Sequence, residues 1–460
     1  MSLVHPIHTE RHIRIICIGA GASSLLFAYK LQRSFNNFSL IFAYFDSFAA
    51  KYGLRQYCRL KHQIVHAAWS TDITRHHHGG GYDFVDTCDI LINAGGVLNS
   101  WRSPAIPFIE KFRGTLVHTA NWDDRIVLEG KHVGLIGKGA ILPEVRKVTT
   151  FIREPTWVSL VQGLEQHIFT VEEKRAFAED PAQLTEYRRA IESGMNGQWA
   201  VFLRHSESQR STRDYMAQQM KEKLRNPQHK NLLIPEWSVG CRRITITPGV
   251  GYLESLGHEK TQVVYGNIDA INENGCICDD GKEYPVDVLI CATGFDTSFR
   301  PRFPIIRPAG NKLQDDWQHE PQSYLGIAAA GIPNYLTFLG PNSPVGNGPV
   351  LSAIEAQADY MMKLIDRYQT TNIRAFAPRP DAVRKFIEFK NQLMQRTSTL
   401  HYIEAMSEVC MDDWEVEYNG SRLAWLGNGE YHSRGKRLRI LSKSGTRKPE
   451  STAFTVFPSM

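Results

Sequence analysis

The chain has 460 residues and a formal net charge of +5, with 42% hydrophobic and 22% charged residues. This composition is typical of a globular protein of about two to four domains, and no apolar run is long enough to span a bilayer. The positive charge comes from residues 431–460, which hold seven Lys or Arg and one acid. The rest of the chain is close to neutral, which argues against a groove for nucleic acid.

Residues 13–31 predict the strand, glycine turn and helix of a dinucleotide site. Gly19 permits the tight turn, and Gly21 lets the backbone approach a pyrophosphate at the helix N-terminus. We expect cofactor contacts from Gly19, Gly21, Ala22 and Ser23. Ser24 stands where the motif has its third glycine, so it crowds the contact between helix and strand.

Such a site also carries an acid that binds the ribose, about 20 residues further on. Asp46 lies at about that distance, but its neighbours Phe42, Phe45 and Phe48 recur at helical spacing. We therefore interpret Asp46 as a solvated helix residue rather than a ribose ligand.

Two further patterns precede the middle of the chain. The strand over 91–94 ends at Gly95 and resembles the return strand of a first dinucleotide-binding half. Residues 112–123 then read F-x-G-x-x-x-H-x-x-x-W-D, with Phe112, Gly114, His118 and Trp122 at the fixed positions. Without further context, this stretch could also be an ordinary loop with a buried Trp and a surface His.

A second strand and glycine turn follows at Val133–Ile136, with Gly137 and Gly139 in the turn. The next strand covers 148–153, so the crossover over 137–147 is at or below the usual minimum of about a dozen residues. Arg153 ends that strand, where an arginine accommodates the 2′-phosphate of NADP. The alternative for Arg153 is a surface residue before the turn at Pro155. Residues 171–194 and 211–224 are charged and have helical periodicity.

The C-terminal half contains two further candidate segments. A buried strand beginning at Val286 ends in Ala292-Thr293-Gly294, where glycine lets the backbone pass close to a cofactor. The loop 339–348 includes Asn342 and enters a helix over 350–364, so its backbone amides can face an anion or a flavin carbonyl.

Most of residues 10–430 resembles the Baeyer–Villiger monooxygenases, class B flavoprotein monooxygenases of the fungal secondary-metabolite type. The resemblance implies FAD in the first Rossmann unit, NADPH in the second, and O2 and a ketone as substrates. It also implies a catalytic role for Arg243, whose fixed positive charge would stabilise an oxyanion, and a position near NADP for Arg242. His118 would link the domains and shape cofactor binding.

The sequence departs from the family's pattern in three places. Between Ile41 and Phe42 the ribose acid and a segment near the flavin are missing, the second glycine turn is cut short after Gly139-Ala140, and a further stretch is missing after Thr397. Skipped coding segments or a decaying gene would produce such gaps. We therefore expect the chain to hold FAD poorly and to turn over little.

The fold class expected is α/β, with two Rossmann-type dinucleotide-binding domains, both shortened, and a helical insertion. We place the FAD domain at 1–130 and 251–430, the NADPH domain at 131–250, and a basic, disordered tail at 431–460. Two alternatives to ketone oxidation stay open: an N- or S-oxidising flavin monooxygenase, and a catalytically inactive remnant or binding protein.

The eight cysteines form no C-x-x-C pair and favour a reducing compartment, so we expect a cytoplasmic protein. We interpret Cys17 and Cys291 as small core residues. The stretch 75–81, Arg-His-His-His-Gly-Gly-Gly, is interpreted as a hairpin tip rather than a metal site.

Overall fold

The structure is a computed structural model that describes residues 12–19, 21–33, 48–60, 62–70, 85–137, 145–158, 169–203, 205–240, 251–343, 350–393, 399–423 and 453–459. The chain divides into two compact units. Unit 1 combines Met1–Val97 with Thr297–Met460, and unit 2 is Leu98–Asp296.

A three-stranded parallel sheet lies at the centre of unit 1. Its order is β1 (Ile15–Ile18), β4 (Ile90–Asn93) and β14 (Tyr335–Thr337). Ile18 pairs with Asn93, which pairs with Thr337, so all three strands end at the same edge. Helix α1 (Ala22–Arg33) follows β1 directly, as the glycine turn predicts.

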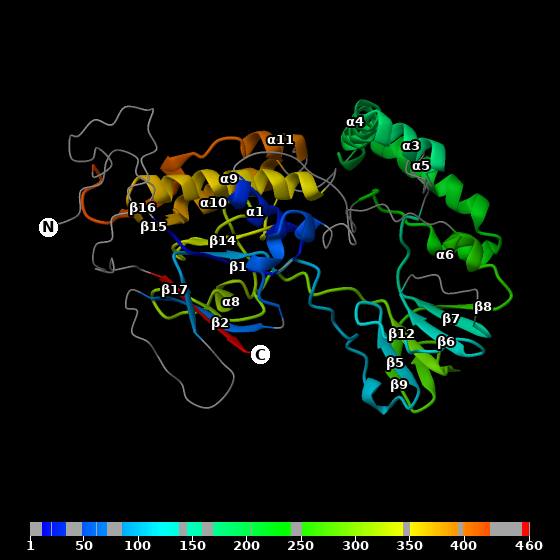
Figure 1. The fold of residues 1–460 in the computed structure, drawn as a ribbon. Coiled ribbons are helices and arrows are strands. Elements are labelled where there is room, and N and C mark those ends of the chain that lie inside the picture. The colour runs from blue at the N-terminus through cyan, green and yellow to red at the C-terminus, as the bar shows by residue number, and fades with distance from the viewer. Residues whose placement is uncertain are drawn as a thin grey trace. The chain divides into compact units, whose positions relative to one another are not determined.

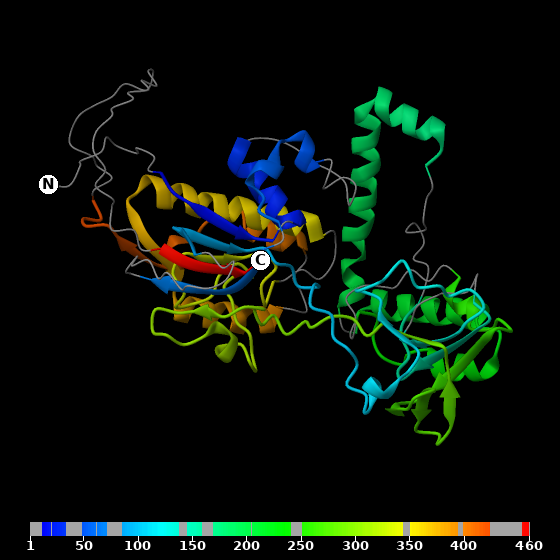
Figure 2. The same ribbon diagram turned by 60° about the horizontal axis from the view of Figure 1, so that its bottom comes forward.

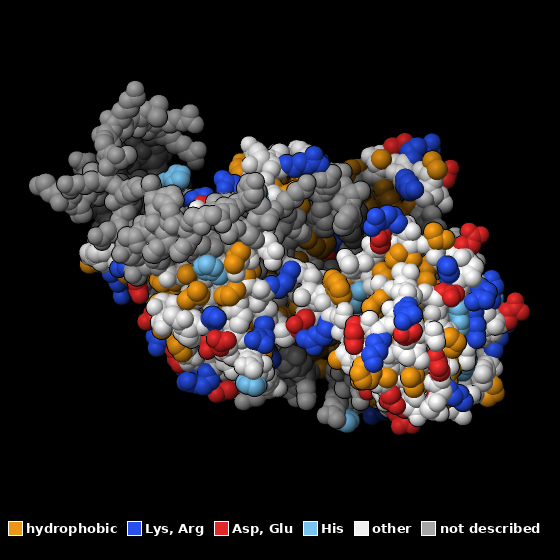
Figure 3. Space-filling view, turned by 90° about the horizontal axis from the view of Figure 1, so that it is seen from below, with side chains coloured by type: hydrophobic (Ala, Val, Ile, Leu, Met, Phe, Trp, Pro, Cys, Tyr) orange, Lys and Arg blue, Asp and Glu red, His pale blue; other side chains and the backbone are white. Residues whose placement is uncertain are grey.

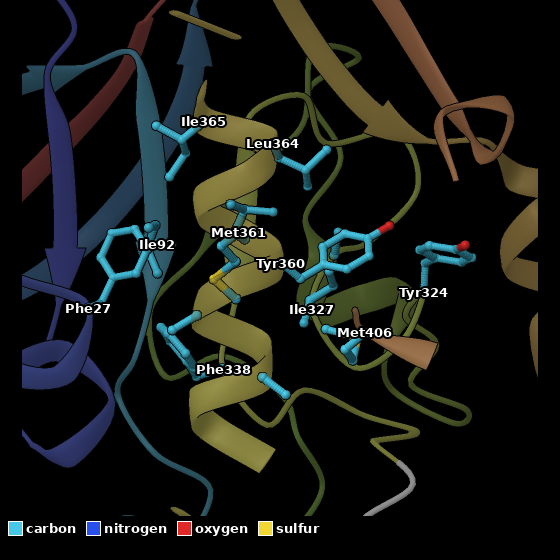
Figure 4. Packing of buried hydrophobic residues seen from close by; sticks show 14 of the residues in the cluster. Phe27, Ile92, Tyr324, Ile327, Phe338, Tyr360, Met361, Leu364, Ile365 and Met406 are labelled. Carbon is cyan, nitrogen blue, oxygen red and sulfur yellow. The ribbon is translucent and has the colours of Figure 1, made fainter. Parts of the chain in front are cut away.

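The two faces of this sheet contribute to different cores. Ile90 and Ile92 belong to a cluster with α1 and helix α9 (Val350–Thr370), while Leu91 belongs to a second cluster on the other face. Figure 4 shows Phe27 and Ile92 against one side of α9, and Tyr324 and Ile327 against the other. The period-2 alternation along β4 therefore fixes which residues meet α9.

A four-stranded sheet covers the second face (Figure 1). Its order is β13 (Ile305–Ile306), β2 (Gln63–Ser70), β17 (Ala453–Ser459) and β3 (Asp86–Cys88). The expectation of a disordered tail over 431–460 is wrong for β17, which pairs with β2 and β3 and buries Val456. The apolar and β-branched residues of β17 have strand propensity that the tail's net charge conceals.

Besides short 3-10 helices at Leu54–Tyr57 and Met411–Asp413, the described part of unit 1 contains five further elements. They are α8 (Leu313–Asp316), β15 (Ile373–Pro378), α10 (Pro380–Leu393), α11 (Thr399–Ala405) and β16 (Trp414–Tyr418). Strands β15 and β16 pair antiparallel, and Trp414 packs into the α9 cluster.

Unit 2 contains a five-stranded, fully parallel sheet. Its order is β5 (Thr115–His118), β12 (Val288–Cys291), β6 (His132–Ile136), β7 (Lys147–Ile152) and β8 (Thr261–Tyr265). β6 and β7 pair in register across a connection of only 137–146, so the short crossover still gives a parallel pair. Both faces of β12 are buried, which explains its uninterrupted apolar sequence.

The helical insertion of unit 2 is confirmed. It comprises α3 (Val171–Glu179), α4 (Pro181–Gly197), α5 (Glu207–Lys223) and α6 (Pro227–Leu233), followed by α7 (Tyr252–Ser255). Thr170 and Glu173 form a reciprocal capping box that starts α3. Figure 2 shows α4 extending away from the parallel sheet of its own unit.

A small antiparallel sheet packs against the parallel sheet of unit 2, with order β11 (Glu283–Pro285), β10 (Gly275–Cys278) and β9 (Ile268–Ile271). Among the described residues, no helix has the length and apolarity to cross a membrane.

On the face drawn in Figure 3, charged side chains of both signs are interspersed.

The unit boundaries differ from the domain boundaries expected at 130 and 250, since the structural units change at 97 and 296. The physical reason is strand pairing: β5 bonds to β12, which ties residues from 98 onward to unit 2. The stretch 75–81 lies outside the described residues.

Candidate functional site

The first glycine turn connects β1 to α1 at the carboxyl edge of the unit 1 sheet. Gly19 has φ of +113°, and a Cβ there would lie 2.5 Å from the carbonyl oxygen of Ala94. Only glycine fits this position, because both the backbone angle and the space forbid a side chain. The turn therefore places Gly19 directly beside Gly95. The ends of β1 and β4 thus lie close enough to contact the same ligand.

Gly21 has a different role from Gly19. A Cβ on Gly21 would meet no described residue within 4 Å, so among these residues nothing covers the backbone there. Ala22 and Ser23 form the first turn of α1, whose N–H groups point toward the same edge. This arrangement suits a pyrophosphate.

Ser24 is buried, and its side chain lies beside the Cys17 thiol. The crowding of the helix–strand contact by Ser24 stays a prediction. Asp46, the candidate ribose acid, lies outside the described residues. Burial keeps the nearby Cys17 neutral by raising the pKa of its thiol to about 11.

The second glycine turn repeats the geometry of the first. Gly137 follows β6 with φ of +118°, and a Cβ there would lie 2.7 Å from the carbonyl oxygen of Ala292 at the end of β12. In both units, the first glycine of the turn lies against the residue that directly follows the neighbouring parallel strand. Gly139 lies outside the described residues.

His118 ends β5, and its ring makes several contacts. Its Nε2 lies 3.2 Å from the hydroxyl oxygen of Thr293, and its Nδ1 accepts a hydrogen bond of 3.0 Å from the Ala120 N–H. The ring also stacks on Trp101, with centroids 4.9 Å apart and planes inclined by 25°. His118 is therefore held by residues from three separate segments of unit 2.

These contacts determine the protonation of His118. The Ala120 N–H is a donor, so Nδ1 is an acceptor and the proton of the neutral ring sits on Nε2, which donates to Thr293. The Thr293 hydroxyl in turn donates to the Arg102 carbonyl oxygen over 2.9 Å. Burial lowers the pKa of His118, and a hydrogen bond with the Gly294 backbone opposes this shift.

Phe112 and Gly114 of the same motif have a packing role. A Cβ on Gly114 would lie 2.5 Å from the Asp287 carbonyl oxygen and 2.5 Å from the Phe112 ring. The ring folds over the glycine and packs against the core of unit 2. Trp122, by contrast, is 42% exposed.

The remaining candidates of unit 2 lie at the carboxyl edge of its sheet or outside the described residues. Arg153 is exposed at the end of β7, and no side-chain partner for it is present among residues that the structure describes. Gly294 has φ of +79°, and a Cβ there would meet none of the residues that the structure describes within 4 Å. Arg242 and Arg243 fall within 241–250, outside the described residues.

Asn342 follows β14 in unit 1, but its side chain is already engaged. Its amide nitrogen donates to the Pro321 carbonyl oxygen over 3.0 Å, and its amide oxygen accepts from Lys390 Nζ over 2.8 Å. The side chain thus anchors the loop, and only the backbone of Asn342 is left to meet a cofactor.

Sequence reasoning missed Trp101, whose ring stacks on His118. Trp101 belongs to none of the sequence patterns described above. Its position shortly before the motif at 112–123 is the only feature of the sequence that could have indicated it. It also missed Gln357, a fully buried amide on α9 whose side chain contacts the loop that carries Asn342.

No family model matches the chain. The chain is 29% identical to the FAD-binding monooxygenase tazF of Aspergillus terreus, over 92% of this chain and 93% of that protein. It is 28% identical to a Baeyer-Villiger monooxygenase of Streptomyces coelicolor, over 79% of this chain and 71% of that protein. These relatives confirm the resemblance to flavoprotein monooxygenases of the Baeyer–Villiger type.

The fold is shared with solved structures. Cyclohexanone monooxygenase from Rhodococcus sp. Phi1 bound to NADP+ matches with a TM-score of 0.74 at 19% identity, covering 89% of this chain and 100% of that chain. A steroid monooxygenase bound to NADP matches with a TM-score of 0.71 at 19% identity, covering 88% and 99%. The α/β fold with two Rossmann-type domains is thus confirmed.

The alignment with the Aspergillus terreus relative spans 524 positions, more than the 460 residues of this chain. Part of the alignment must therefore consist of gaps in this chain. This agrees with the missing segments that the sequence indicates.

Proposed function

We propose that the chain is an FAD- and NADPH-dependent monooxygenase that inserts one oxygen atom of O2 beside the carbonyl of a ketone. The observation that carries the proposal is the repeated glycine turn at Gly19 and Gly137. Two such turns, one in each unit, suit two dinucleotides bound to one chain. The fungal and bacterial relatives named above support the same reaction class.

FAD would bind at Gly19, Gly21 and the first turn of α1, with Gly95 and the backbone of Asn342 at the same edge. NADPH would bind at Gly137, with Arg153 pairing with its 2′-phosphate. Together the bound cofactors supply a hydride and a reduced flavin that reacts with O2. Thr293 and Gly294 would border the NADPH site, and Arg242 would contribute a further positive charge.

Arg243 would stabilise negative charge on the substrate oxygen, because a guanidinium keeps its proton at any relevant pH. His118 would act as a positioning residue. Its neutral ring fixes Thr293 and the Ala292-Thr293-Gly294 turn that lies against Gly137.

The test uses purified full-length chain saturated with FAD, NADPH and a panel of ketones, amines and sulfides. The proposal predicts an ester or lactone from at least one ketone. Arg243→Ala should abolish that product while NADPH still reduces the flavin. Oxidised amines or sulfides without any ester would favour the N- or S-oxidising alternative.

The alignment gaps favour one further candidate, a catalytically inactive remnant. In that case the chain would bind neither cofactor at saturating concentration.

A fungal secondary-metabolite ketone is the substrate class that the relatives' sources suggest, and a screen of polyketide-derived ketones would test it.

A further inference from the structure

Residues 339–343 form the loop that leaves β14 at the carboxyl edge of the unit 1 sheet, which we call the β14 loop. Leu339 has φ of +49° and Asn342 has φ of +67°, both left-handed conformations that non-glycine residues seldom adopt. Such a backbone persists only where the surrounding structure holds it.

Gln357 on α9 holds the β14 loop at both ends. Its side-chain oxygen accepts a 2.9 Å hydrogen bond from the Leu339 N–H. Its amide nitrogen donates to the Ser343 hydroxyl over 3.2 Å and to the Tyr402 hydroxyl over 2.8 Å. With both donors and its acceptor occupied, this fully buried side chain is completely satisfied.

Tyr402 on α11 completes the network. Its hydroxyl accepts from Gln357 and donates to the Leu325 carbonyl oxygen over 2.6 Å, and its side chain is buried. Gly326 lies against Ser343, where a Cβ would meet the Ser343 hydroxyl, and its carbonyl accepts from the Gly340 N–H over 2.8 Å. Segment 325–326 and the β14 loop are thus fixed against each other.

One N–H of the β14 loop stays unpaired in this arrangement. The N–H groups of Leu339, Gly340 and Ser343 donate within the protein, and Pro341 has none. Across the residues that the structure describes, no acceptor is found for the N–H of Asn342. A half-buried backbone donor of this kind calls for a partner.

We propose that Gln357 and Tyr402 are positioning residues that hold the Asn342 N–H toward bound flavin. This inference rests on the proposed function, because it assumes that FAD occupies the carboxyl edge of the unit 1 sheet. Neither side chain touches the cofactor itself; both act through the β14 loop.

The test compares Tyr402→Phe and Gln357→Leu with Tyr360→Phe. Tyr360 is a matched control, because it is a buried tyrosine on α9 whose hydroxyl accepts from Trp414 Nε1 over 3.2 Å. Within the described residues, no hydrogen bond joins its side chain to the β14 loop. Readouts are the FAD dissociation constant, the visible spectrum of bound flavin, and amide hydrogen exchange at 339–343 without FAD.

We expect Tyr402→Phe to weaken FAD binding by about tenfold and to shift the flavin spectrum, with faster exchange at Leu339. Tyr360→Phe should leave all three readouts within about twofold of wild type. Gln357→Leu should change the three readouts in the same direction as Tyr402→Phe. If Gln357→Leu does not fold, the comparison of Tyr402→Phe with Tyr360→Phe alone tests the positioning role.

Equal FAD affinity and equal spectra in Tyr402→Phe and Tyr360→Phe would overturn the positioning role alone. Absence of saturable FAD binding in the wild-type chain would overturn the proposed function and the positioning role together. The two failures are therefore distinguishable.

Discussion

The Nε2 atom of His118 lies 3.2 Å from the hydroxyl oxygen of Thr293, and this contact joins the ends of β5 and β12. β12 also pairs with β6, whose following residue is Gly137. The motif residue His118 is thus connected to the second glycine turn through β12, the strand that lies between β5 and β6.

Thr293→Val should destabilise the fold, because the His118 ring and the Arg102 carbonyl oxygen each lose a hydrogen bond to the Thr293 hydroxyl. Each such bond contributes about 0.5 to 1.5 kcal/mol. Urea unfolding of both proteins measures the difference. Thr371→Val is the control, since the Thr371 hydroxyl only donates to the Arg367 carbonyl oxygen at an exposed helix end. Equal losses in the two variants would contradict the assigned contact.

Stability should decrease as the pH falls below about 6.5, the ordinary histidine value. Burial lowers the pKa of His118 in the folded chain, so the unfolded chain takes up its proton first. The contribution of His118 is complete above the unfolded pKa and is lost as the pH falls through the folded pKa. Unfolding free energies from pH 7.5 to 5 should therefore fall less steeply in His118→Gln than in the exposed control His319→Gln. If the unfolding free energies of the two variants had the same pH dependence, His118 would take up its proton equally well in the folded and unfolded chain.

Gly114→Ala should destabilise unit 2 by about 1 to 3 kcal/mol through overpacking. The new methyl group would lie 2.5 Å from both the Asp287 carbonyl oxygen and the Phe112 ring. Gly194→Ala provides the opposite control: Gly194 lies in α4 with nothing within 4 Å, so alanine should stabilise by about 0.5 to 1 kcal/mol. Thermal unfolding distinguishes the two, and a neutral Gly114→Ala would mean that the Phe112 ring moves aside.

Val456→Ala should cost on the order of 2 kcal/mol, because Val456 is 1% exposed in the core beneath β17. Val65→Ala on the neighbouring β2 should change little, since Val65 is 47% exposed. Chemical unfolding of the two variants tests whether the C-terminal strand belongs to the folded core. Equal stabilities would show that β17 is dispensable.

Arg153→Ala should weaken NADPH binding more than NADH binding, because only NADPH carries the 2′-phosphate. Arg189→Ala, an exposed arginine on α4, should affect neither. Titration of each nucleotide against the purified variants measures the ratio. Equal losses for NADPH and NADH would remove Arg153 from the site.

The sequence predicted much of the framework, because strand, glycine turn and helix are local patterns. Gly19, Gly137 and the strand before Thr293 all lie where those patterns placed them. The pairings that the structure adds are long-range. β17 joins β2 and β3 from the far end of the chain, and no local signal identifies its partners.

Side-chain roles were harder to predict than positions. The expected contact of the Asn342 loop with a cofactor through backbone amides stays a prediction, whereas no sequence pattern showed that the Asn342 side chain bridges Pro321 and Lys390. Gln357 has no motif around it, and its importance follows only from three hydrogen bonds to residues distant in sequence. A glutamine at helical spacing from Ile354, Tyr360 and Met361, on the apolar face of α9, is the sequence signal that could have indicated it.

The most direct test of the central claim is a single reaction with purified full-length chain, FAD in excess, NADPH and a ketone panel, analysed by mass spectrometry in 18O2. The chain should be purified with less than one flavin per protein and take up more on addition of FAD. NADPH should then reduce the bound flavin, and an ester or lactone carrying one 18O atom should form from a ketone. Saturable flavin binding with NADPH oxidation but no labelled ester from any ketone would contradict the Baeyer–Villiger assignment.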